Sequence, residues 1–132
     1  MRVLVDTSAV IAVVTNEPHK YAIAKATRGA ELLAPTSLHW EIGNAFSAMM
    51  KRRRLSLDSA IAAVNEFKKI PIRLIDVDLE SSLNIASANG MYASDAYVLA
   101  AATAWHAPLL TLDEPLSLVA RKLGIPILEL LP

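Results

Sequence analysis

Four acidic residues stand where a carboxylate can do chemistry. Asp6 and Asp113 each follow directly on a short apolar run, so both should lie at the carboxyl end of a buried strand, where open α/β sheets bind ligands. Asp95 falls in the first turn of an otherwise apolar helix, and Glu41 lies on a helix that follows a strand. An acid among apolar residues needs a partner, because an unpaired buried charge is very costly. If the four carboxylates converge, their repulsion favours a bound Mg²⁺ or Mn²⁺, because these cations prefer oxygen ligands.

A metal ion held by carboxylates, with water in its remaining positions, can activate a water molecule and stabilise charge on a phosphodiester. Such hydrolysis needs no histidine or cysteine, which suits a chain without cysteine. Thr111 lies two residues before Asp113 and can orient a metal-bound water. A simpler interpretation stays open for Asp6, because an aspartate at this place is also a good N-cap for a helix. The three histidines show no ligand spacing: His19, His39 and His106.

A basic run at residues 51–54 ends the helix that carries Glu41. Asn44 and Arg52 return close to the angle of Glu41 around that helix, and Arg52 lies ~16 Å farther along the axis, by a rise of ~1.5 Å per residue. That spacing suits a phosphate a few nucleotides from the cut, so Asn44, Arg52 and Arg53 are candidate RNA contacts. The alternative, a charged helix end exposed to water, is the commoner outcome for such a run.

Two tryptophans can likewise be interpreted either as nucleic-acid contacts or as packing residues. Trp40, beside Glu41, and Trp105 can stack on bases of a nucleic acid. Large aromatic side chains on core helices are more often packing or dimer contacts, however, because they bury so much apolar surface.

Strands and helices alternate along the chain, and turn or cap residues separate them. The apolar runs predict strands at residues 3–5, 32–34, 72–75, 108–112 and 127–128. The helical periodicity predicts helices, counted with their expected caps, at residues 7–14, 19–27, 37–54, 56–69, 78–89, 94–106 and 115–124. This alternation predicts one domain over residues 1–132, a three-layer α/β/α fold with a mainly parallel central sheet of about four to five strands.

The composition excludes several classes of function. Of the 132 residues, 54% are apolar, enough for one buried core, and thirteen basic residues balance thirteen acidic ones, so no overall field attracts nucleic acid or membrane. The absence of cysteine excludes disulfides, thiolate catalysis and thiolate zinc sites. The longest stretch without a formal charge, residues 96–112, contains His106 and Pro108 and is a poor membrane span, for which ~20 apolar residues are needed. Glycine-rich nucleotide-binding loops are absent as well. We therefore expect a soluble, cytoplasmic protein.

Four short motifs follow one another along the chain, each built around one of the acids. They are Val-Asp-Thr-Ser at residues 5–8, Glu-Ile-Gly-Asn at 41–44, Ser-Asp-Ala-Tyr at 94–97 and Leu-Thr-Leu-Asp at 110–113. In this order, and in a chain of this length, they resemble the PIN-domain ribonucleases, and especially the small VapC-like toxins of type II toxin–antitoxin pairs. Haloacid-dehalogenase phosphatases fit worse, because they want a second aspartate where this chain has Ser8.

The resemblance implies that Asp6, Glu41, Asp95 and Asp113 bind Mg²⁺ or Mn²⁺ and catalyse RNA cleavage. It also implies homodimerisation and inhibition by a cognate VapB-like antitoxin. Because four clustered carboxylates attract cations, we expect that antitoxin to insert an arginine among them and to lay an apolar segment on the first two helices. The alternative is a non-catalytic RNA- or protein-binding module that keeps the same fold and an inert acidic pocket.

Overall fold

The computed structural model describes residues 1–131, which form four strands and seven helices. In chain order these elements are β1 (Arg2–Val5), α1 (Thr7–Val14), α2 (Lys20–Ala26), β2 (Glu31–Pro35), α3 (Leu38–Lys51), α4 (Leu57–Lys69), β3 (Ile72–Ile75), α5 (Leu79–Asn89), α6 (Ala93–Trp105), β4 (Leu109–Leu110) and α7 (Glu114–Lys122). The predicted alternation of strands and helices is therefore confirmed.

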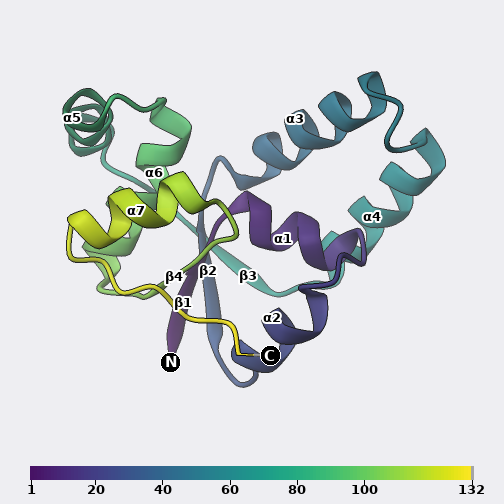
Figure 1. Cartoon of the computed structure of the whole chain (residues 1–132), viewed down its shortest axis with the longest axis horizontal. Helices are drawn as coiled ribbons and strands as arrows, with labels where there is room; N and C mark the ends of the chain where they lie inside the picture. Colours follow the sequence, from purple (N-terminus) through teal and green to yellow (C-terminus); the bar gives the residue numbers. More distant parts are fainter. Residues whose placement is uncertain (132) are drawn as a thin grey trace.

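The strands form one parallel sheet in the order β3-β2-β1-β4. Val3 pairs with Leu32 and Leu4 with Leu109, so β1 lies at the centre between β2 and β4. In a parallel sheet all carboxyl ends meet at one edge. Asp6 and Asp113 therefore come to the same edge of the sheet, beside the segment that leads from β2 into α3 (Figure 1).

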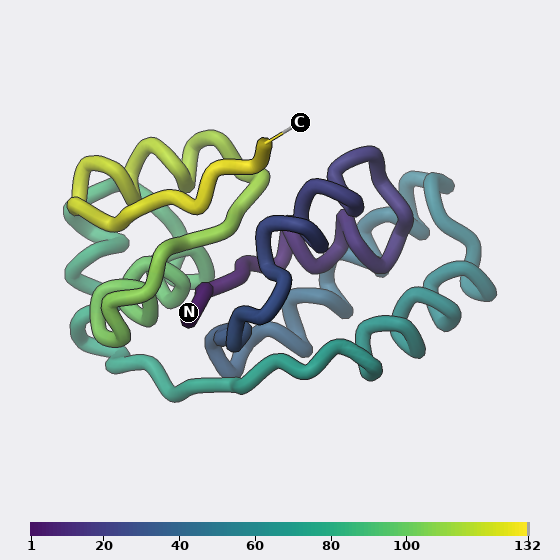
Figure 2. The backbone as a smooth tube through the Cα atoms, turned by 90° about the horizontal axis from the view of Figure 1, so that it is seen from below, coloured from purple at the N-terminus to yellow at the C-terminus, as the bar shows by residue number. Residues whose placement is uncertain are grey.

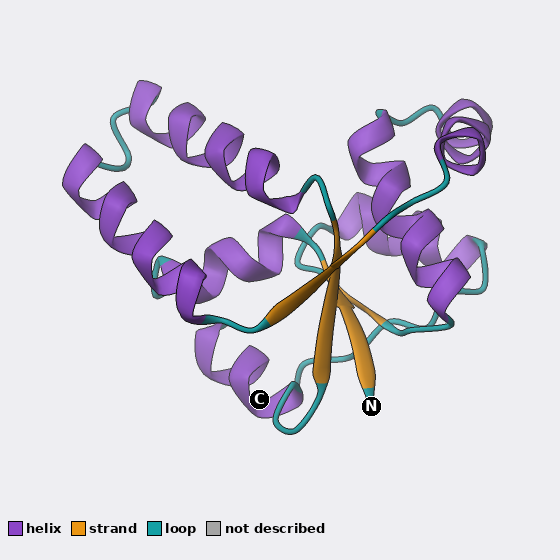
Figure 3. Cartoon of the chain, turned by 180° about the vertical axis from the view of Figure 1, so that it is seen from behind, coloured by secondary structure: helices purple, strands orange, loops and turns teal. Residues whose placement is uncertain are grey.

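Helices cover both faces of the sheet, which gives the predicted three layers (Figure 3). Alternate residues of a strand point to opposite faces, so Val3 and Val5 enter a core with α1, α3 and α4, whereas Leu4 enters a second core with α6 and α7. Both cores are fully buried around these strand residues. The continuous apolar runs of the strands follow from this burial on both faces.

Side-chain caps start four of the seven described helices, namely α1, α4, α5 and α7. Ser56 caps α4 and Asp78 caps α5, each accepting a hydrogen bond from the backbone N–H three residues later. Ser37 stands before α3 but makes no such bond, so its predicted role as a side-chain cap is wrong. Its backbone is already helical, and its hydroxyl donates to the Glu41 carboxylate instead.

The last part of the sheet is shorter than expected. The predicted strand at residues 108–112 has only two strand residues, and Ile127 makes a single bridge to Leu109 rather than a fifth strand. After Leu110 the backbone N–H groups of Leu112 and Asp113 donate to side-chain hydroxyls, which ends the ladder. The regular backbone pairing of the sheet therefore ends at the edge to which Asp6 and Asp113 come.

The helices α3 and α4 extend together away from the sheet (Figures 1 and 2). The basic run follows α3 at the far end of this projection, while Glu41 lies in the first turn of α3, next to the sheet. Within residues 1–131, no helix is both long enough and apolar enough to span a bilayer.

Candidate active site

Asp6 is the most buried acid of the cluster, with only 6% of its surface exposed. It follows β1 and is the N-cap of α1, and its Oδ1 accepts a hydrogen bond of 3.1 Å from the Ala9 N–H. The Ser8 hydroxyl donates to the same oxygen at 2.7 Å, and the Thr111 hydroxyl donates to Oδ2 at 2.5 Å. One carboxylate thus caps α1 and also accepts the two hydroxyl hydrogen bonds, because its two oxygens have about four lone-pair sites.

Ser8 and Thr111 connect the end of β1 to the end of β4. Their hydroxyl oxygens lie 3.3 Å apart, and each also accepts a backbone N–H, that of Leu112 for Ser8 and that of Asp113 for Thr111. Both side chains are therefore committed to fixing the Asp6 carboxylate and the loop before α7. These contacts position the Asp6 carboxylate. The predicted role of Thr111 in orienting a metal-bound water stays a prediction.

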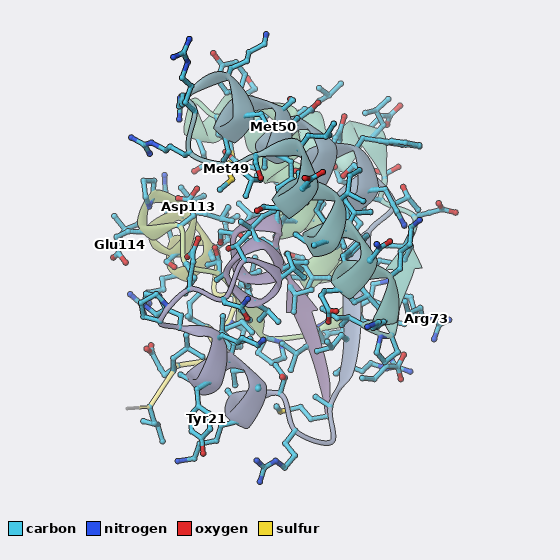
Figure 4. The ribbon with its side chains drawn as sticks, turned by 90° about the vertical axis from the view of Figure 1, so that its right-hand side faces the viewer. Tyr21, Met49, Met50, Arg73, Asp113 and Glu114 are labelled. Atoms are coloured by element: carbon cyan, nitrogen blue, oxygen red, sulfur yellow. The ribbon has the colours of Figure 1, made fainter. Side chains whose placement is uncertain are left out.

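Asp113 caps α7 as Asp6 caps α1. Its Oδ1 accepts a hydrogen bond of 3.1 Å from the Leu116 N–H, and the side chain is half-buried. Pro115 occupies the second helical position rather than the predicted first, because Glu114 already belongs to the helix. Figure 4 shows Asp113 and Glu114 side by side at the start of α7.

Glu41 and Asp95 lie in the first turns of α3 and α6, where the helix dipole favours negative charge. Both are half-buried. The Ser37 hydroxyl donates to Glu41 Oε2 at 2.6 Å, across one turn of helix. The Asp95 carboxylate accepts no hydrogen bond from any part of the chain that the structure describes, so it keeps all its lone pairs.

The electrostatics connect the four acids. Burial raises the pKa of Asp6 and the nearby charge of Asp113 adds to the rise, whereas the hydrogen bonds from Thr111, Ser8 and Ala9 lower it. Burial likewise raises the pKa of Glu41, with further increases from the charges of Asp95 and Asp6, against a decrease from Ser37.

Asp95 completes this set. Burial is the main cause of the raised pKa of Asp95, and the charge of Asp113 raises this pKa further. The charges of Asp113, Asp95 and Asp6 therefore each raise the pKa of at least one other acid of the set, as expected for neighbouring carboxylates. The ion pairs of residues 1–131 use other acids, namely Glu31, Glu66 and Glu129. No side-chain cation of the described chain neutralises the cluster.

The donor set fits a hard divalent cation, because it consists of carboxylate oxygens with hydroxyl groups behind them. In residues 1–131, however, no three acidic or histidine side chains are gathered closely enough to hold one ion together. Glu41, Asp95 and Asp113 would complete the ligand set of an ion bound here. Asp6 is fixed in place by its three donors and would be the anchor.

The candidate RNA contacts lie outside the acidic cluster. Arg52 and Arg53 are exposed where α3 ends, and Arg53 adopts a left-handed backbone with φ of 56°. Asn44 is exposed on α3 itself. Their predicted role in phosphate binding stays a prediction.

The two tryptophans differ in their surroundings. Trp105 lies between the guanidinium groups of Arg2 and Arg73, each 5.0 Å from its ring centroid, so packing accounts for it. Trp40 is 76% exposed and remains open to a ligand. Sequence reasoning did not assign Ser37 a place in the site, although its position four residues before Glu41 in a helix was a readable signal.

Comparison with known proteins supports the fold. A family model described as PIN domain matches residues 3–122. The crystal structure of PAE2754 from Pyrobaculum aerophilum superposes with a TM-score of 0.68 at 20% identity, covering 94% of this chain and 90% of that chain. The structure of VapBC2 from Rickettsia felis bound to a DNA fragment from their promoter superposes with a TM-score of 0.65 at 14% identity, covering 98% of each chain. A comparison with curated protein sequences finds no match.

Proposed function

The chain belongs to the PIN domain family, and from that premise we propose that it is an endoribonuclease that depends on Mg²⁺ or Mn²⁺. The observation that carries this proposal is the set of four carboxylates at one sheet edge. Burial raises the pKa of three of them, and no cation of residues 1–131 pairs with any of the four. Such a cluster is stabilised by a hard cation and is unfavourable without one.

Each residue of the cluster has a role in this proposal. Asp6 anchors the ion, and Ser8 and Thr111 hold its carboxylate in one orientation. Glu41, Asp95 and Asp113 complete the ligand set. A bound Mg²⁺ or Mn²⁺ would supply Lewis-acid stabilisation for the scissile phosphate and activation of the attacking water.

The substrate path follows α3. Phosphates near the cut meet the ion, while Asn44 and then Arg52 and Arg53 contact phosphates farther along the strand. The total charge of the chain is zero, so this short basic segment provides a local attraction that the whole molecule lacks.

We also propose that the protein is the toxin of a toxin–antitoxin pair, acts as a homodimer and works in the cytoplasm. The structural likeness to VapBC2 supports the pairing, since that structure holds VapBC2 bound to a DNA fragment from their promoter. Exposed apolar side chains support a partner surface, among them Leu57 at 63% and Leu118 at 58% exposure. The antitoxin would be VapB-like and would reach the acids with a cation.

One experiment separates this function from a non-catalytic binding module. Labelled RNA is incubated with the protein while Mg²⁺ is titrated from EDTA upwards. An endoribonuclease cuts internal phosphodiester bonds only when metal is present. RNA binding without cleavage at any Mg²⁺ or Mn²⁺ concentration would identify the inert module instead.

A further inference from the structure

A second concave site lies beside the acids, where β2 and β3 end. It has a volume of about 370 Å³, within the range of small-ligand sites. Its lining residues come from the last residue of β2, the segments after β2 and β3, and helices α3, α5 and α6: Pro35, Thr36, Ser37, Trp40, Val77, Leu79 and Tyr97. We call it the β2–β3 pocket.

The β2–β3 pocket and the acidic cluster share a wall. Ser37 lines the pocket, and its hydroxyl donates to Glu41 Oε2 at 2.6 Å. Trp40 is adjacent to Glu41 in the same turn of α3. In the order β3-β2-β1-β4, Asp6 and Asp113 follow β1 and β4, Glu41 lies in the first turn of α3 after β2, and the pocket stands at the ends of β3 and β2. The strands are about 4.8 Å apart, so the two sites follow one another along a single edge within roughly 10 Å.

The lining of the pocket selects a neutral ligand. None of its seven residues carries a charge, so it offers no cation to a phosphate. Trp40 presents a ring that is 76% exposed, and its aromatic neighbour is His39, tilted at 6.3 Å. Three residues with hydroxyl groups line the same pocket, namely Thr36, Ser37 and Tyr97. A flat ligand with hydrogen-bonding edges suits this combination of an aromatic face and hydroxyls.

We propose that the β2–β3 pocket receives one unpaired base of the RNA substrate, next to the scissile phosphate and stacked on Trp40. The inference rests on the proposed ribonuclease function and adds a subsite to it. A base in this pocket places the following phosphate at Glu41 and the ion. The protein would then cut in single-stranded or looped RNA, because only an unstacked base can enter.

A protein side chain is the competing occupant, and the rest of the surface argues against it. A different concave site between α1, α2 and the sheet is lined almost wholly by apolar residues such as Val10, Val13 and Ile23. That site suits an apolar partner segment far better than the hydroxyl-lined β2–β3 pocket does. The β2–β3 pocket also opens beside the acids, where substrate must pass.

The test measures binding rather than turnover. Labelled oligouridylate hexamers are titrated in Mg²⁺ against proteins that all carry Asp113→Asn, so that the probe stays intact. Trp40→Ala should weaken binding roughly 5- to 100-fold, the range of one lost base stack, and Trp40→Phe should restore most of it. Tyr21→Ala removes an equally exposed ring on α2, far from Asp113 in Figure 4, and should change nothing.

A second probe separates base stacking from other effects. A hexamer without bases, with ribose and phosphate alone, should bind the parent and Trp40→Ala proteins equally. Equal affinity of these two proteins for the intact hexamer would overturn the inference, as would an equal weakening for both probes. Unchanged RNA affinity with a weaker complex to a protein partner would assign the pocket to that partner.

The fate of the inference is distinguishable from that of the proposed function. Wild-type protein that cleaves RNA in Mg²⁺, together with unchanged binding by Trp40→Ala, overturns only the base pocket. A base-dependent loss at Trp40 in a protein that never cleaves supports the pocket and refutes the ribonuclease.

Discussion

Asp6 combines a structural and a chemical role in one side chain. Its Oδ1 caps α1, and Thr111 and Ser8 orient the whole carboxylate. An asparagine caps helices as well as an aspartate does, so Asp6→Asn retains the cap and removes the charge. Single-residue changes can therefore separate folding from chemistry at this position.

The first prediction concerns all four acids. Asp6→Asn, Glu41→Gln, Asp95→Asn and Asp113→Asn should each lower the RNA cleavage rate by more than ~100-fold, since even residues behind metal ligands cost 10–100-fold when removed. Circular dichroism should show an unchanged fold. Wild-type cleavage rates in any two of these variants would mean that the site is assigned wrongly.

The second prediction concerns the pH dependence of stability in EDTA. Burial raises the pKa of Asp6 above its ordinary value of 3.8, so the folded protein holds this proton more tightly than the unfolded chain does. The stability that this proton contributes is present below pH 3.8 and is lost as the pH rises through the folded pKa. The variant Asp6→Asn has no carboxyl group at this position, so its folding stability should not fall with pH for this reason.

Urea unfolding of both proteins between pH 3.5 and 7 measures the effect, with roughly half-unit steps chosen to resolve a single titration. The stability of Asp6→Asn relative to wild type should increase with pH and then level off. A difference that stays constant, or that falls as the pH rises, would show that the carboxylate is not held in an unfavourable charged state.

At the scale of elements, α3 joins the acidic cluster to the basic run. Glu41 lies in its first turn and Arg52 directly after its last residue, with the exposed Asn44 between them. The third prediction is that Arg52→Gln with Arg53→Gln weakens RNA binding and reduces the slope of log affinity against log salt by about 1.4, at ~0.7 for each phosphate contact to a single strand.

A matched control for this pair exists on α2 and just after it. Lys25→Gln with Arg28→Gln also removes two exposed cations; α2 lies at the bottom of Figure 1, whereas α3 ends at the top right. This control should leave both the affinity and the salt slope unchanged. If the two double variants behave alike, the basic run is an ordinary helix terminus in water.

Sequence reasoning succeeded for elements whose signals are local. The apolar runs, the aspartate caps and the breaks before and after α3 and α4 place most boundaries within two residues. It failed where distant contacts decide. The Leu112 N–H donates to the Ser8 hydroxyl across 104 positions, and this contact helps to end β4 after two residues. The β2–β3 pocket likewise depends on strand order, which no local pattern encodes.

The whole molecule has no net charge, but its acidic and basic side chains are not evenly distributed. Ion pairs such as Arg121 with Glu129 lie away from the acids, and the cluster at the sheet edge has no cation of its own in the part of the chain that the structure describes. A partner that supplies one would bind strongly. The fourth prediction is that an antitoxin with an arginine in this site competes with metal.

The measurement follows RNA cleavage in a Mg²⁺ titration, with and without the product of the neighbouring gene. The apparent affinity for Mg²⁺ should fall as the partner is added, because guanidinium and metal compete for the same carboxylates. A stable complex with undiminished cleavage and unchanged metal affinity would exclude this mode of inhibition.

The central claim is that these four carboxylates together bind the divalent ion. Electron paramagnetic resonance of free Mn²⁺, titrated into wild-type protein and into Asp6→Asn, tests it without RNA and without a partner. Wild-type protein should take up Mn²⁺ at a saturable site, and Asp6→Asn should lose that uptake while remaining folded. Equal Mn²⁺ binding by the two proteins would contradict the account.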